Sequence, residues 1–170
     1  WLRQAPYMPQ CSPIAKSPFA SRIEKLPPEE QFAAMELFRG TMVRHSLSVY
    51  REDRPGFKSP VRFDEDGWQE LIPIRLPTTI AVQERLPKGA AAVLINQAHT
   101  FTDLYLPIGP SEKDWYDAIN GENNIKTILR RTHSGSGPKG QARVKGFFET
   151  LWHYDQVVFD ASKANGFDRP

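Results

Sequence analysis

Apolar side chains recur at helical spacing in residues 28–38, and this pattern predicts the first helix of the chain. Its expected buried face holds Phe32, Met35 and Phe38. Pro28 fits the first turn of a helix, because the amide hydrogen that proline lacks would be unpaired there. Gly40 follows the last apolar position and is typical of a helix end.

Alternation of apolar and polar residues predicts strands elsewhere in the chain. The expected strands are residues 43–49, 78–84, 90–96 and 101–106. The last three are separated by short connections, one of which contains Pro87 and Gly89, so we expect an antiparallel three-stranded meander. Residues 51–67 are charged and turn-rich, and we expect a loop there.

Three amphipathic helices and a final strand are predicted after the meander. The first begins at Ser111, a favourable N-cap, and is closed by Asn120-Gly121. The second and third are expected at residues 124–131 and 141–154, and the strand at residues 157–160. Residues 133–140 are rich in glycine and serine, so a flexible loop is expected before the third helix.

The opening segment has a different character, because six of the 15 prolines lie between Pro6 and Pro28. Proline interrupts long helices, so we expect this segment to run extended over another surface. Its apolar side chains would otherwise face water. They are Trp1, Leu2, Tyr7, Met8, Ile14 and Phe19. The chain starts at Trp1 without a charged and apolar leader, and we expect it to be part of a longer protein.

Composition places the chain among globular proteins, with 39% hydrophobic and 25% charged residues. The expected fold class is α+β, in an N-terminal helix-plus-strand part (residues 1–76), a second part (residues 77–160) and a tail (residues 161–170). No apolar run reaches the roughly 18 residues of a membrane helix, so no membrane partner is expected. The single cysteine, Cys11, cannot form an internal disulfide, which favours a cytoplasmic location.

A local cluster of positive charge is the clearest candidate binding feature, although the net charge is only +2. Residues 123–148 contain no acidic residue and six basic ones: Lys126, Arg130, Arg131, Lys139, Arg143 and Lys145. Such a run could be a solvated surface, could contact nucleic-acid phosphates, or could bind an acidic peptide or partner domain. The low net charge argues against a general nucleic-acid binder.

His99 and Asp103 form the one pair with acid–base potential, because a carboxylate can orient an imidazole. Polar turn chemistry is the simpler interpretation of the pair. The four histidines have no zinc-ligand spacing, so no metal site is expected. Cys11 has no histidine nearby in sequence, which weakens a nucleophilic role. We therefore expect this chain not to be catalytic by itself.

The second half resembles small winged helix-turn-helix domains, such as the pyrroloquinoline quinone peptide chaperone and precursor-peptide recognition elements. The resemblance covers residues 78–160. It rests on Ile108, Glu112, Trp115, Ala118, Ile119, Asn120, Gly121, Ile125, Ile128, Leu129, Phe147, Phe148, Leu151, Trp152 and the strand from Val157 to Phe159. It implies a winged-helix-like fold. It also implies that an extended segment adds to an edge of the meander and lies beside the third helix.

The first part is similar to the region that follows the catalytic domain in some bacterial class I S-adenosylmethionine-dependent methyltransferases. The similarity rests on residues 1–11 and 37–46. The Gly-rich loop that holds the cofactor in such enzymes is absent from this sequence. The resemblance therefore implies that S-adenosylmethionine binds in a preceding domain of the parent chain, and that this chain holds no cofactor.

These observations give one leading hypothesis and two alternatives. The leading one is a non-catalytic C-terminal accessory domain that positions a substrate, a peptide or a protein partner for a methyltransferase. The first alternative is a nucleic-acid-binding module that uses the basic run. The second is an independent enzyme that uses His99 and Asp103. For strand addition, the candidate edge is at residues 78–83, where flanking prolines and charges favour a protected edge instead.

Overall fold

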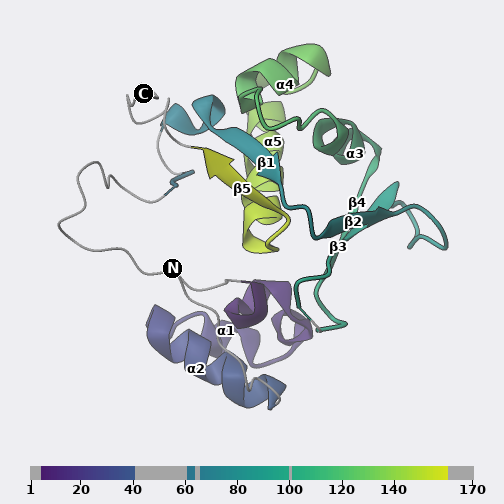
Figure 1. Cartoon of the computed structure of the whole chain (residues 1–170). Coiled ribbons are helices and arrows are strands. Elements are labelled where there is room, and N and C mark those ends of the chain that lie inside the picture. The colour runs from purple at the N-terminus through teal and green to yellow at the C-terminus, as the bar shows by residue number, and fades with distance from the viewer. Residues whose placement is uncertain (1–4, 41–60, 64–65, 100, 161–170) are drawn as a thin grey trace.

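The computed structural model describes residues 5–40, 61–63, 66–99 and 101–160, and these residues form a mixed fold of the α+β class. Figure 1 shows a small group of helices from the N-terminal residues below a larger part with two sheets and three helices. The strand predicted at residues 43–49 and the tail at residues 161–170 lie outside the described residues.

The N-terminal helical unit (residues 5–40) begins with short helical turns, so the expectation of an extended segment is wrong for its described part. The turns are the 3-10 helices η1 (Ala5–Tyr7), η2 (Pro9–Cys11) and η3 (Pro13–Lys16), followed by α1 (Ala20–Ile23). Prolines open η2 and η3, where their fixed φ suits the turn and no amide hydrogen is needed. A proline-rich sequence therefore excluded a long helix but not a series of short ones.

The predicted helix at residues 28–38 is confirmed as α2 (Pro28–Arg39), which ends at Gly40 in the left-handed region with φ 62°. Met35 is fully buried against Ile14 and Ile23. Phe38 was expected on the same buried face, but it is 52% exposed. The cluster around Met35 is small, which explains why it covers only a narrow strip of the helix.

The predicted meander is confirmed as an antiparallel sheet in the order β2-β3-β4. Its strands are β2 (Thr79–Val82), β3 (Ala92–Asn96) and β4 (Tyr105–Ile108). The third strand begins later than predicted, because residues 101–104 form a turn that the Leu104 amide closes on the Phe101 carbonyl. Leu104 is buried against the helical unit, which explains why its apolar character does not mark a strand.

A second, two-stranded sheet joins β1 (Ile72–Arg75) to β5 (Val157–Asp160) in antiparallel register. β5 was predicted, whereas β1 was not. A short helical segment, η4 (Asp66–Glu70), precedes β1. β1 lies before residue 76 and pairs with a strand from the other predicted part. The division of the chain at residue 76 stays a prediction.

Helices α3 (Pro110–Asp117) and α4 (Ile125–Arg131) follow β4 in the order that the sequence predicts. The N-cap of α3 is Gly109 and not Ser111, because Pro110 already occupies the first turn. The Glu112 carboxylate accepts a hydrogen bond from the Gly109 amide at 2.8 Å. Asn124 caps α4 by accepting from the Thr127 amide at 3.0 Å.

Helix α5 (Gly137–His153) is longer than predicted, so the expected loop at residues 133–140 is wrong for its second half. A proline lies in its first turn, where it is tolerated. Gly140 packs closely on the preceding chain, since a Cβ there would lie 3.0 Å from the Gly135 carbonyl carbon. This glycine permits a close approach of two backbone segments instead of providing flexibility.

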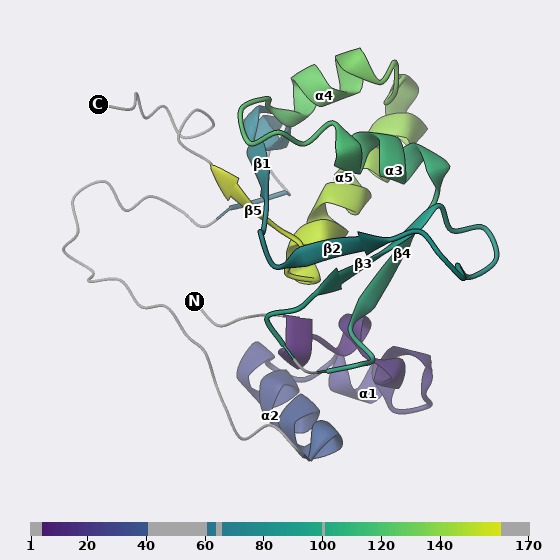
Figure 2. The same cartoon turned by 45° about the vertical axis from the view of Figure 1, so that its right-hand side comes forward.

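The main core lies between the sheets and helices α3, α4 and α5. Its fully buried side chains include Leu94, Ile108, Ile119, Ile125, Ile128, Val144, Phe148 and Leu151. The helical unit packs near the beginning of β4, away from α3 and α4 (Figure 2). There the Ala5 amide donates to the Asp155 carboxylate at 3.3 Å, and Leu104 packs on Ala5 and Cys11.

Candidate binding groove between β4 and α5

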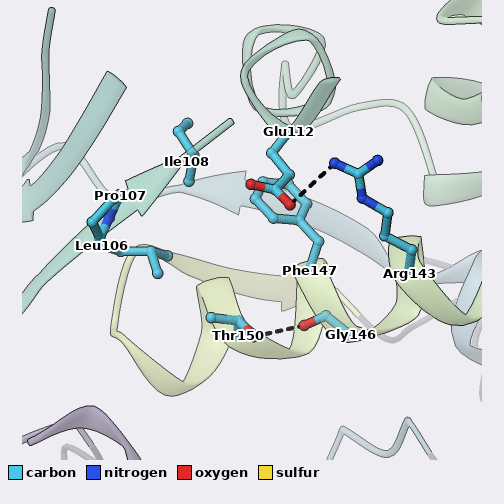
Figure 3. Close-up of a pocket in the computed structure, with 8 residues that line it drawn as sticks. All are labelled: Leu106, Pro107, Ile108, Glu112, Arg143, Gly146, Phe147 and Thr150. Carbon is cyan, nitrogen blue, oxygen red and sulfur yellow. Dashed lines mark hydrogen bonds and ion pairs between the residues drawn. The ribbon is translucent and has the colours of Figure 1, made fainter. Parts of the chain in front are cut away.

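A groove of about 310 Å³ lies between β4 and α5, with the beginning of α3 at one end. Figure 3 shows the side chains that line it, which come from these three elements. Its apolar surface is contributed by Leu106, Ile108 and Phe147. Phe147 is fixed against the Trp115 ring, with 5.5 Å between ring centroids. The groove is therefore bounded by side chains that the core holds in place.

One wall of the groove is the outer edge of β4. This strand alternates between exposed and buried residues, so Leu106 and Ile108 point inward while Tyr105 and Pro107 are exposed. β4 is the last strand in the sheet order, and no strand among the described residues pairs with its outer side. Backbone groups on that side can pair with an added strand, except at Pro107, which has no amide hydrogen.

The opposite wall is α5, which carries a glycine where the helix faces the groove. Apart from its chain neighbours and the nearby backbone of α5 itself, no atom lies within 4 Å of the position that a Cβ on Gly146 would take. One turn later, the Thr150 hydroxyl donates to the Gly146 carbonyl at 2.7 Å. Glycine inside a helix costs roughly 0.5–1 kcal/mol relative to alanine, so Gly146 leaves space at a cost in stability.

The third boundary is a pair of opposite charges at the Ile108 end. The Glu112 Oε1 atom lies 3.5 Å from Arg143 Nη2, and Oε2 accepts from the Gly109 amide. The Arg143 guanidinium also lies over the Trp115 ring, 5.4 Å from its centroid. The Arg143 side chain is 56% exposed, so it is accessible from the groove mouth.

The predicted basic run is divided by the fold. Of its six members, Arg143 lines the groove. Lys126 forms an ion pair at 3.6 Å with Glu70 of η4, a residue outside the run. The other four, Arg130, Arg131, Lys139 and Lys145, lie on α4 and α5, and the first three are exposed. Acidic residues distant in sequence thus neutralise part of a segment that has none of its own.

Asp103, a member of the predicted acid–base pair, binds Arg39 of the helical unit. Both carboxylate oxygens lie at hydrogen-bond distance from Arg39 Nη1, at 2.9 and 3.0 Å. The same guanidinium lies 4.6 Å from the Phe101 ring centroid, and its Nε donates to the Pro6 carbonyl. His99 is near this site, with its ring 6.2 Å from that of Phe101. The acid–base role of the pair stays a prediction.

Cys11 belongs to the helical unit and is buried where the unit packs on Leu104, and its thiol donates to the His153 carbonyl at 3.7 Å. Burial, and then the nearby charge of Asp155, raises the pKa of the Cys11 thiol to about 12. The thiol is therefore protonated at neutral pH and is a poor nucleophile.

The described residues contain no group of three or more histidine, cysteine or carboxylate side chains that could hold a metal ion. Within the same part of the chain, no helix combines the length and apolar character needed to cross a bilayer. No family model matches the chain, and a search of curated proteins found no match.

Sequence reasoning identified Arg143 but did not place Glu112, Gly146 or Thr150 in a site. The glycine was a usable signal, because an isolated glycine in an amphipathic helix often has a packing or functional reason. The pairing of Glu112 with Arg143 depends on how α3 crosses α5, which no local pattern reveals. The strand edge considered from sequence, at residues 78–83, does not contribute to this groove.

Proposed function

We propose that this chain is a non-catalytic accessory domain that holds an extended peptide or protein segment between β4 and α5. One observation carries the proposal: the edge of β4 lies beside α5, Gly146 leaves open space on the helix, and the groove between them has an apolar lining. An added strand gains main-chain hydrogen bonds from such an edge, and adjacent side-chain pockets provide selectivity. The segment would pair along the four residues of β4, a length of about 13 Å at roughly 3.3 Å per residue.

The order of elements from β2 to β5 supports our proposal that this part of the chain has a winged-helix-like fold. A three-stranded meander is followed by three helices and a strand, as in the domains that the sequence resembles. We further propose that the domain serves a bacterial class I methyltransferase, whose catalytic domain binds S-adenosylmethionine and modifies the segment or its carrier. The buried free thiol of Cys11 fits a reducing, cytoplasmic compartment.

The two alternatives have less support from the described residues. Nucleic-acid binding would use the basic run, but Lys126 and Arg143 already have acidic neighbours. Catalysis by His99 and Asp103 would require a carboxylate that is engaged with Arg39. A peptide segment in the groove leaves the Lys126–Glu70 and Arg39–Asp103 pairs in place, because none of these four residues lines the groove.

Selection from a random ten-residue peptide library displayed on phage, against the 170-residue chain, tests the proposal. We expect enrichment of sequences with apolar residues at alternate positions. Gly146→Leu fills the groove and should reduce binding of the enriched peptides at least about 10-fold, or about 1.4 kcal/mol. Gly146→Ala is the matched control. It adds one methyl group in open space, should stabilise α5 by up to about 1 kcal/mol, and should retain most of the binding.

Two results would overturn the proposed function. The first is that the wild-type chain enriches no peptide. The second is that Gly146→Leu binds the enriched peptides as tightly as the wild type does, while circular dichroism shows that both are folded. Amide chemical-shift changes on addition of an enriched peptide should be concentrated in β4 and the facing side of α5.

A further inference from the structure

Resting on the proposed function, we infer that the groove selects a segment with an acidic side chain next to its apolar residues, and that Arg143 recognises this side chain. A groove alone does not determine the chemistry of the segment that it binds. Here three features do: how Arg143 is held, how weak its present ion pair is, and how charge is distributed along the groove.

Arg143 is positioned by contacts that leave most of its hydrogen-bond donors available. Its guanidinium lies over the Trp115 ring, a contact that uses the face of the group and none of its N–H bonds. Trp115 is itself buried, so this platform is fixed. An arginine held in this way is preorganised to present its planar donors to a carboxylate.

Glu112, the present partner of Arg143, engages few of the hydrogen-bond donors of the guanidinium. The contact with Glu112 joins one Nη atom to one oxygen at 3.5 Å, which is long for an N–H···O bond. The second Glu112 oxygen accepts from the Gly109 amide, and the arginine's hydrogen bond is to Oε1 alone. A half-exposed pair of this kind contributes about 0–1 kcal/mol. A carboxylate on the bound segment could form the stronger two-bond arrangement.

The distribution of charge along α5 indicates at which end of the bound segment the acidic residue lies. Lys139 lies one turn before Arg143, so the two cations share a face of the helix. The other end of the groove, at Thr150, is followed by His153 and Tyr154, which contact η2 through Cys11 and the Gln10 carbonyl. The positive end is therefore the Ile108 end. A segment antiparallel to β4 begins there, so its acidic residue should precede its apolar residues.

The peptide library described above supplies the probe. We expect Asp or Glu to be enriched immediately before the alternating apolar positions. In fluorescence anisotropy at about 0.15 M salt, changing that acid to its amide should weaken binding about fivefold. Arg143→Gln should remove the difference between the acid and amide peptides.

Three further variants separate recognition by Arg143 from general attraction. Arg130→Gln removes the same charge from exposed α4, outside the groove, and should keep the fivefold preference. Arg143→Lys keeps the charge but not the planar donors, and should lose most of the preference. Glu112→Gln retains an oxygen for the Gly109 amide while removing the competing charge, and should increase the preference.

The possible failures are distinct. Enriched apolar peptides without an acidic preference would overturn this inference and leave the proposed function standing. Equal loss of preference in Arg143→Gln and Arg130→Gln would also overturn it, because long-range attraction would then be sufficient. Acidic residues enriched after the apolar positions would refute the direction assigned to the segment. A library with no enriched peptide would overturn the proposed function itself.

Discussion

β2 and β4 are the two edge strands of one sheet, but they differ in what lies beside them. β4 alternates between exposed and buried residues and borders the groove with α5. β2 shows no such alternation, since Ile80 (39% exposed) and Ala81 are both exposed, and it contributes no residue to the groove lining. The difference shows that an unpaired edge becomes a candidate site where a helix beside it adds a second wall.

The two edges also differ in the devices that limit pairing with other chains. Around β2, prolines and charges lie outside the strand, at Pro77, Glu84, Arg85 and Pro87. In β4 the device is internal, because Pro107 removes one donor from the strand. β2 is thus limited at its ends, whereas β4 is limited from within: alternate residues face its outer edge, so Pro107 removes one of the two amide donors that the strand could present there.

The largest expected effect compares one isoleucine from each edge strand. Ile108→Ala should destabilise the protein by about 2–5 kcal/mol, since Ile108 is 1% exposed and packs in the main core. Ile80→Ala should cost less than about 1 kcal/mol. Urea denaturation followed by circular dichroism measures both. Equal destabilisation would show that β2 supports the core as much as β4 does.

The next effect concerns the contact between the helical unit and the beginning of β4. The Arg39 side chain is 5% exposed and binds both oxygens of Asp103, so Arg39→Gln should cost about 1.5–3 kcal/mol. The helical unit should also be released locally, which would speed tryptic cleavage after Lys16, Arg22 and Lys25. Lys25→Gln, at an exposed position of the same unit, is the control for stability. Unchanged cleavage in Arg39→Gln would contradict this role of the pair.

The smallest effect comes from restoring the missing donor of β4. Pro107→Ala supplies an amide hydrogen, and one further hydrogen bond of about 0.5–1.5 kcal/mol should tighten binding of an enriched peptide up to about 10-fold. Pro87→Ala, next to β2, should leave binding unchanged. Fluorescence anisotropy measures both affinities. Weaker binding by Pro107→Ala would argue against main-chain pairing at β4.

Local patterns were sufficient where one element carries a complete apolar face. The alternation in β3 and the helical spacing in α4 predicted both elements, because each buries one side against the core. β1 was not predicted, since it is short, contains Pro73 and is completed by pairing with β5, which is distant in sequence. The start of α5 was interpreted as a loop because the segment is rich in glycine, although Gly140 serves close packing and not flexibility.

The candidate site was predictable in part. The basic run indicated Arg143, because a run of like charges is visible in sequence. The weak ion pair of Arg143 and the empty space at Gly146 arise where β4, α3 and α5 meet. Neither feature could be derived from the sequence of one element alone. The edge considered from the sequence was residues 78–83, whereas the edge strand that lines the groove with α5 is β4. The resemblance to peptide-recognising domains stays a prediction.

The contacts of residues 153–160 have a consequence for how the chain folds during synthesis. The Ala5 amide binds Asp155, 150 residues later in the chain, and β1 pairs with β5. Chains grow at roughly 5–20 residues per second, so the first helices wait on the order of ten seconds for these partners. During that interval the helical unit is held by its own contacts, such as the small cluster around Met35 and the Tyr7–Phe32 ring pair, and its docking surface is open to chaperones.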